Sequence, residues 1–428
     1  MTTSRGEVSP YDWLVWPDGA LEVALAQDVR RRDVVAYLGE REYATLAPLA
    51  RAAAHVVRDP ERVVYLIPGI MGSQLGLRRA AGEPPDLLWL DPMDLQRGRL
   101  MDLSLDAERD GTGRAPIVSL GAMPYSYLAL KLRLEVAGFT VRWADYDWRL
   151  GIEDNGARLA ARITAEPARH VHLVGHSLGG LVARAALAAS DASIERLVTL
   201  GTPHRGSLAA LQALRASYIT VRRIAQLDPS RSAEQLAESV FASFPSLYQM
   251  LPAQCGTLDL RDGLQWPDSM PRPRREQLQA LGSPELPWHP GRSHCIAGRG
   301  FDTVARVTVE DGQFRYHVTR DGDGTVPCDS AAPAGQAAHY TSTLHGELPR
   351  DATVAEAVID LLDTGRTQAL ADRPASVSAT ERSITDVELQ SACRNKLDWA
   401  TLSPAERRDW FASLNQPVAA GSPLESSA

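Results

Sequence analysis

The sequence has 428 residues, of which 44% are hydrophobic and 23% are charged, and its formal net charge is −8 at pH 7. This length and composition predict a soluble globular protein with one large core and appendages. The negative charge and the lack of a dense Lys/Arg run argue against a nucleic-acid partner. The four cysteines have no metal-ligand or disulfide-framework spacing, and no apolar stretch matches a membrane span or a secretion signal. We therefore expect a reduced, cytoplasmic protein without a metal or other cofactor.

Residues 1–60 are predicted to form an entry segment. The turn signal Pro17-Asp18-Gly19 lies between the apolar runs 13–16 and 20–25. This pattern predicts a β-hairpin, followed by a helical stretch at 27–57. Two helices are the alternative.

Short apolar strands separated by helical patterns run from residue 61 to residue 362. The pattern predicts a buried, mainly parallel sheet with helices on both faces and functional groups at the carboxyl ends of the strands. Two stretches, roughly 76–121 and 206–293, exceed a minimal domain of this kind and are predicted cap insertions. The predicted strands are 63–67, 140–144, 171–174, 194–200 and 294–297.

The composition changes after residue 362. Residues 363–384 are polar, with proline, glycine and several Ser/Thr, and are predicted to form a linker. Residues 385–415 predict a small helical appendage, because Ser403-Pro404-Ala405-Glu406 is a capping box with proline at the first helical position. Residues 416–428 are expected to form a disordered tail.

The most informative motif is Gly175-His176-Ser177-Leu178-Gly179. It lies between an apolar strand and a helical pattern, which is the order of the nucleophile elbow in an α/β-hydrolase. Its glycines allow the sharp turn that presents the serine hydroxyl. The motif therefore predicts an α/β-hydrolase fold with Ser177 as the nucleophile. The alternative is a glycine-rich turn in an unrelated α/β protein.

A serine nucleophile needs a histidine base oriented by a carboxylate, and in this fold they follow in the order Ser, Asp or Glu, His. Asp323, in the glycine-rich run 321–327, is the predicted acid, and Asp321 is the reserve. His345 lies 22 residues beyond Asp323, just before a helical pattern, and is the predicted base. His339 is closer to Asp323 but lies in a predicted strand.

Two backbone N–H donors are needed to hold the oxyanion of the tetrahedral intermediate. Leu178, the residue after the nucleophile, is the first predicted donor. The second is expected from the loop 68–73, where glycines let the backbone face the site. Met71 is our choice there, and Ile70 is the next candidate. A phosphate-binding function is disfavoured for this loop because it lacks the Walker lysine.

Other features near these loops have simpler interpretations. His176 and His204 lie beside the predicted site and are expected to support it. The run that starts at Asp321 resembles a calcium loop only in part, because Thr325 and Val326 occupy its fifth and sixth positions and its twelfth position is not acidic.

Several motifs together resemble the lecithin:cholesterol acyltransferase family, which includes the lysosomal phospholipase/transacylase. Besides the elbow, the similarity lies in Pro-Gly-Ile-Met-Gly-Ser-Gln-Leu at 68–75 and Gly-Asp-Gly-Thr-Val at 322–326. It also lies in Tyr146-Asp147-Trp148-Arg149-Leu150 and Gly201-Thr202-Pro203. These motifs span residues 62–362 and suggest an intracellular member of bacterial type.

This resemblance implies the same site: Ser177, Asp323 and His345 as the triad, and Met71 with Leu178 as the oxyanion pair. It also implies a mobile lid and a lipid or other acyl-ester substrate. For Asp147, Trp148 and Arg149 of the second motif we expect a buried ion pair and a packing indole.

The predicted function is that of a serine-dependent lipase or phospholipase-type acyl hydrolase that works through an acyl-enzyme, with acyltransferase activity as an extension. The expected partners are an acyl-ester substrate, a membrane surface touched transiently by the cap, and a protein bound through the terminal appendages. Two alternatives stay open. One is an esterase of a soluble ester or lactone, and the other is an inactive hydrolase scaffold that docks a partner.

Overall fold

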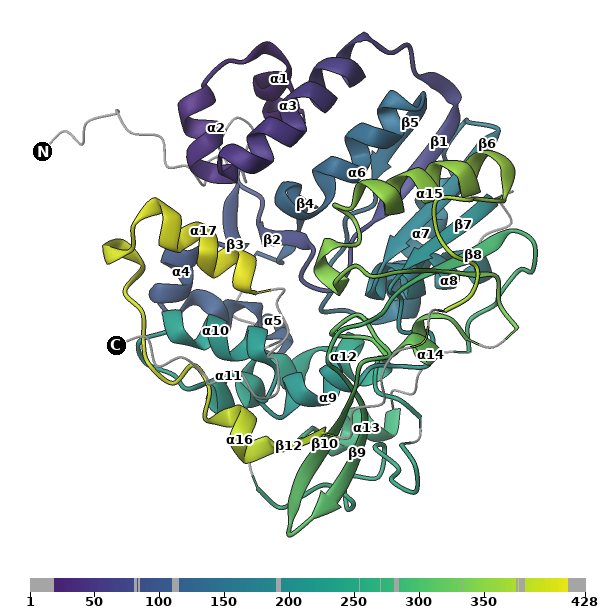
Figure 1. The fold of residues 1–428 in the computed structure, drawn as a ribbon. Coiled ribbons are helices and arrows are strands. Elements are labelled where there is room, and N and C mark those ends of the chain that lie inside the picture. Colours follow the sequence, from purple (N-terminus) through teal and green to yellow (C-terminus); the bar gives the residue numbers. More distant parts are fainter. Residues whose placement is uncertain are drawn as a thin grey trace, which may run out of the picture.

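The computed structural model describes residues 19–80, 83, 85–109, 115–189, 194–253, 255–269, 271–280, 285–333, 335–374, 376 and 382–414. Its centre is a six-stranded parallel sheet with the strand order β11-β8-β7-β6-β1-β5. Figure 1 labels each of these strands except β11. All five strands predicted from apolar runs are present, and His339 lies in the sixth. The strands are β1 (Asp59–Ile67), β5 (Phe139–Trp143), β6 (His170–His176), β7 (Ile194–Leu200), β8 (Ser293–Gly298) and β11 (Ala338–Thr341).

Helices cover both faces of this sheet, which explains the nearly continuous apolar strands. Alternate residues of β1 point to opposite faces. Val63, Tyr65 and Ile67 pack with α7 (Ile152–Thr164) and α8 (Leu178–Ala189). Val64 and Leu66 pack with α6 (Pro124–Val136) and α15 (Ala352–Thr364) on the other face. The fold is therefore of the α/β-hydrolase type.

The strand order reverses at β1, which pairs with β5 on one side and β6 on the other. Ile67, the last residue of β1, lies beside Gly175 of β6. The loops that leave these two strands therefore start next to each other. In open parallel sheets the crevice at such a reversal is where ligands bind.

The first described residues are helical. The helices α1 (Ala20–Gln27), α2 (Arg31–Leu38) and α3 (Glu40–His55) pack on α6. The hairpin prediction is wrong for residues 20–25, which lie in α1, and its first arm, 13–16, lies outside the described residues. Leu21, Ala24 and Leu25 are buried at helical spacing, so burial on one helix face decides the conformation here.

The two predicted insertions contain mostly short elements. The first holds most of a small antiparallel sheet, β2 (Ser73–Leu77), β3 (Asp86–Trp89) and β4 (Val118–Ala122), with α4 (Pro92–Gln96), η2 (Arg99–Leu103) and α5 (Leu105–Arg109). The second holds α9 (Leu208–Leu214), α10 (Ile219–Leu227), α11 (Ala233–Ser239), η3 (Phe241–Ser243), α12 (Pro245–Gln249) and α13 (Arg275–Ala280). The insertions meet where α10 packs against α4.

The C-terminal part departs from the predicted linker. Residues 382–384 belong to β12 (Arg382–Thr385), which pairs with a hairpin that was not predicted, β9 (Thr303–Glu310) and β10 (Gln313–Thr319). After β12 come α16 (Asp386–Gln390), η5 (Trp399–Thr401) and α17 (Pro404–Ser413), and the predicted capping box begins α17. None of the helices in the described ranges is long and apolar enough to cross a bilayer.

Candidate active site

Ser177 stands in the sharp turn between β6 and α8. Its φ of 53° lies in the left-handed region, which is strained for a residue with a side chain. A Cβ on Gly179 would lie 2.3 Å from the Pro68 carbonyl oxygen, so glycine is required for α8 to start this close to the end of β1. The elbow therefore holds Ser177 at the reversal of the strand order.

Asp323 and His345 are in direct contact. His345 opens the short helix η4 (His345–Glu347), and its Nδ1 lies 2.7 Å from Oδ2 of the fully buried Asp323. The other carboxylate oxygen accepts the backbone N–H groups of Thr325 and Val326 at 2.9 and 2.7 Å. Because Oδ2 holds the proton of Nδ1, the lone pair of Nε2 is left free to act as a base.

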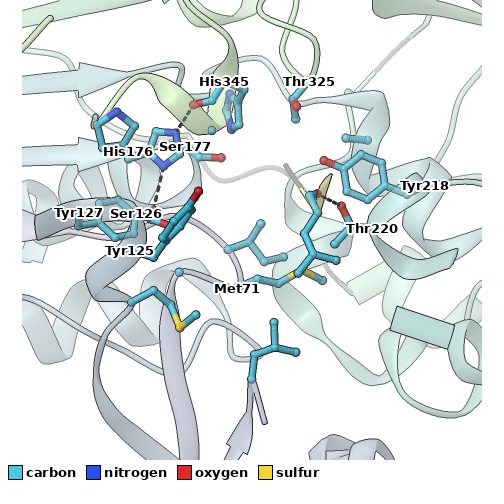
Figure 2. Close-up of a pocket in the computed structure, with 18 of the residues that line it drawn as sticks. Met71, Tyr125, Ser126, Tyr127, His176, Ser177, Tyr218, Thr220, Thr325 and His345 are labelled. Carbon is cyan, nitrogen blue, oxygen red and sulfur yellow. Dashed lines mark hydrogen bonds between the residues drawn. The ribbon is translucent and has the colours of Figure 1, made fainter. Parts of the chain in front are cut away.

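Ser177 and His345 line one cavity. Figure 2 shows them together with His176, while Tyr218 and Thr220 lie across from them. Asp321, the reserve acid, instead forms an ion pair with Arg299 at 2.7 Å. Of the two carboxylates considered for the acid, Asp323 contacts His345 and Asp321 contacts Arg299 instead.

Gly201 has a role that its motif did not reveal. It follows β7 with a φ of 54°, and a Cβ there would lie 2.8 Å from Oδ2 of Asp323 and 2.9 Å from Nδ1 of His345. Any side chain at this position would displace the carboxylate or the imidazole.

The loop after β1 carries Met71 to the cavity. Gly72 N–H donates to the Gly69 carbonyl at 3.0 Å, which closes a turn around Met71, whose φ is 62°. The Met71 carbonyl accepts the indole N–H of Trp89 at 2.9 Å, which holds the peptide between Met71 and Gly72. Ile70 also lines the cavity. Leu178 begins α8, so its N–H is one of the first-turn donors that no helix carbonyl accepts.

His176 links this loop to His345 through a chain of buried and partly buried hydrogen bonds (Figure 2). Gly69 N–H donates to the Tyr127 hydroxyl at 2.8 Å. That hydroxyl donates to His176 Nδ1 at 2.9 Å, because a neutral ring that donates through Nε2 accepts at Nδ1. His176 Nε2–H then donates to the backbone carbonyl of His345 at 3.0 Å. Burial holds the pKa of His176 well below its ordinary value, which keeps the ring neutral and this arrangement of protons stable. Tyr127 lies in an apolar helical pattern, and no sequence signal distinguished it.

His204 serves the surrounding structure. Its Nδ1 accepts a hydrogen bond from Arg184 at 3.0 Å, and burial lowers its pKa to about 3. Sγ of Cys295 lies 3.6 Å from its Nε2, but burial raises the pKa of this thiol to about 12. The pair is therefore neutral, and the thiol is a poor nucleophile.

The Asp147-Trp148-Arg149 motif has the expected structural role. Arg149 is fully buried, and its guanidinium forms two hydrogen bonds to Asp147, at 2.9 and 2.7 Å. It also donates to the Leu103 carbonyl in the first insertion at 3.0 Å. The Trp148 indole donates to the Ser73 carbonyl at 3.0 Å, two residues beyond Met71. The motif thus ties the first insertion to the loop after β1.

The cavity has a volume of about 190 Å³ and a mainly apolar wall. Its lining includes the loop after β1, parts of both insertions, α2 near the N-terminal end of the described chain and α17 near its C-terminal end. No carboxylate lines it among the described residues, and these residues contain no cluster of three or more His, Cys, Asp or Glu able to hold a metal ion. Apolar lining residues include Met71, Trp89, Met123, Ala213, Leu247 and Met250.

The sheet and the elbow together define an α/β-hydrolase-like protein. Residues 159–244, which run from α7 through the elbow into the second insertion, match a family model described as a PGAP1-like alpha/beta domain. No curated protein sequence matches the chain.

The lipase BlEst2 of Bacillus licheniformis resembles the chain distantly. Its propeptide form is 18% identical with a TM-score of 0.37, and the alignment covers 76% of this chain but only 54% of that one. Its mature form is 16% identical with a TM-score of 0.36, over 72% of this chain and 94% of that one.

Proposed function

We propose that the protein is a serine-dependent hydrolase of carboxylic esters of the lipase type. The observation that carries this proposal is the 2.7 Å contact between Asp323 and His345 at the cavity lined by the elbow residue Ser177. A nucleophile, a base and an orienting carboxylate are the three groups that acyl transfer through serine requires.

In the proposed reaction, Oγ of Ser177 attacks the ester carbonyl carbon while Nε2 of His345 takes its proton. Asp323 stabilises the imidazolium, and the N–H groups of Met71 and Leu178 hold the oxyanion. His345 then protonates the leaving alcohol, which departs as the acyl-enzyme forms. A water molecule activated by His345 hydrolyses this intermediate, and an alcohol in its place would complete an acyl transfer.

The lining of the cavity favours an ester with an apolar acyl chain. Apolar walls with a few polar groups at one end suit such a substrate, because the chain is removed from water as the carbonyl reaches Ser177. The resemblance to the lecithin:cholesterol acyltransferase family supports the same substrate class. A transient contact of the insertions with a lipid surface belongs to this proposal.

Labelling with a fluorophosphonate and hydrolysis of nitrophenyl and lipid esters test the proposal. Ser177→Ala should abolish labelling and lower kcat by about 10⁴-fold or more. Ser230→Ala is the matched control, since Ser230 is an exposed serine that does not line the cavity, and it should change kcat by less than about threefold.

The outcomes separate the alternatives. Residual activity of Ser177→Ala above a tenth of the wild-type value would refute the serine mechanism. A sharp optimum at acetyl esters would favour a soluble ester or lactone as the substrate. Failure of the folded wild-type protein to react would favour the inactive scaffold.

A further inference from the structure

The helix α17 contributes to the wall of the cavity although the proposed reaction uses none of its residues. Arg408 and Phe411 are three residues apart and share one face of the helix, and Leu414, the helical-geometry C-cap residue, continues this spacing. All three line the cavity that Ser177 and His345 also line. The cavity is therefore completed by a segment more than 60 residues beyond His345 in the sequence.

Phe411 is held in a cluster of three aromatic rings. Its ring packs edge to face against Trp410 and Trp399, with centroid distances of 5.3 and 5.6 Å, and the two indoles pack against each other at 5.5 Å. Trp399 and Trp410 are buried. Edge-to-face contacts in this distance range are favourable and directional. The Phe411 side of the cavity is thus a preformed wall.

Hydrogen bonds anchor α17 at two points. Near its C-terminal end, the Thr220 hydroxyl of α10 donates to the Leu414 carbonyl at 2.6 Å. Further back, the Arg408 guanidinium donates to the Ala36 carbonyl of α2 at 3.1 Å. The same α2 supplies Tyr37 and Leu38 to the cavity wall. Elements from the two ends of the described chain therefore support each other where they close the cavity.

We propose that Phe411 and Leu414 determine which acyl chains the site accepts. A rigid apolar wall favours acyl chains that fill the space in front of it and excludes longer ones. Each methylene of the chain that is taken out of water raises kcat/KM by about fourfold. This inference rests on the proposed function, since it requires an acyl ester bound at Ser177. It assigns to the C-terminal appendage a direct contact with the substrate.

Two substitutions test the inference in opposite directions. Phe411→Ala removes the ring from the wall, and kcat/KM should rise for long chains relative to acetyl by about fourfold for each methylene newly accommodated. Leu414→Phe narrows the cavity, and the optimum should move to shorter chains. Leu402→Ala is the matched control, because Leu402 is a partly buried apolar residue of the same appendage that does not line the cavity.

The assay is a nitrophenyl ester series from acetyl to palmitoyl, together with the labelling rate of Ser177 by ethyl and dodecyl fluorophosphonates. The expected result is opposite shifts for the two variants in both measurements and an unchanged profile for Leu402→Ala. An equal change for all chain lengths, or the wild-type profile in both variants, would overturn the inference. Absence of labelling and hydrolysis in wild type would instead mean that the proposed function has failed.

Discussion

Tyr127→Phe removes one hydroxyl and with it both hydrogen bonds that join the loop after β1 to His176. Gly69 N–H loses its acceptor and His176 Nδ1 loses its donor, at sites where the 2.8 and 2.9 Å contacts are buried. Each buried polar group left without a partner costs about 1–3 kcal/mol, so the free energy of unfolding should fall by about 2–6 kcal/mol. The free energy of unfolding of a typical domain is about 5–15 kcal/mol, so this loss would be a large part of it.

The same substitution should also lower kcat. His176 loses the bond that orients its ring, and through its 3.0 Å bond to the His345 carbonyl this loosens the base. A misplacement of about 1 Å can reduce the rate about 100-fold, so we expect kcat to fall between about tenfold and 100-fold with little change in KM. A lower kcat with an unchanged KM would then identify Tyr127 and His176 as residues that position the base.

Urea unfolding followed by circular dichroism and ester hydrolysis measure the two effects. Tyr125→Phe is the matched control on the same helix, because its side chain is only partly buried, and it should change the free energy of unfolding by less than about 1 kcal/mol. If Tyr127→Phe proves as stable and as active as Tyr125→Phe, the reasoning about this chain of hydrogen bonds is wrong.

Three further predictions follow from other contacts. Asp323→Asn should leave the fold intact and lower kcat by about 10⁴-fold, and steady-state hydrolysis checks this. The amide oxygen would accept the N–H groups of Thr325 and Val326, so the NH2 group would face His345 Nδ1 and could not accept its proton. Asp386→Asn should destabilise the protein by about 3–5 kcal/mol in urea unfolding, since Asp386 and its partner Arg215, 2.9 Å away, are both buried. Burial lowers the pKa of His172 to about 4, so below pH 6.5 the unfolded chain takes up a proton that the folded chain excludes. The free energy of unfolding should therefore decrease as the pH is lowered from 7 to 5. The midpoint of urea unfolding should decrease less over this range in His172→Gln than in the wild-type protein.

The elbow, the core strands and the order of the site residues could be predicted because each depends on local patterns. Five apolar runs identified strands that are buried on both faces, and the glycines around Ser177 identified a turn that only small residues allow. Asp323 and His345 could be chosen because they follow Ser177 in the order that the fold requires. The hairpin at 20–25 failed for a related reason. A short apolar run suits a strand or a helix, and packing against α6 decides between them.

The sequence by itself therefore determined the fold class and the candidate residues for nucleophile, acid and base. Only the tertiary structure decided what surrounds them: the hydrogen bond from Tyr127 to His176, the close approach of Gly201 to the Asp323–His345 pair, and the place of Phe411 in the cavity wall. These contacts join residues far apart in the chain. The local sequence around each of these residues gives no indication of the residue that it contacts. Backbone geometry imposes local periodicity on a sequence, whereas a contact between distant segments arises only when the whole chain packs.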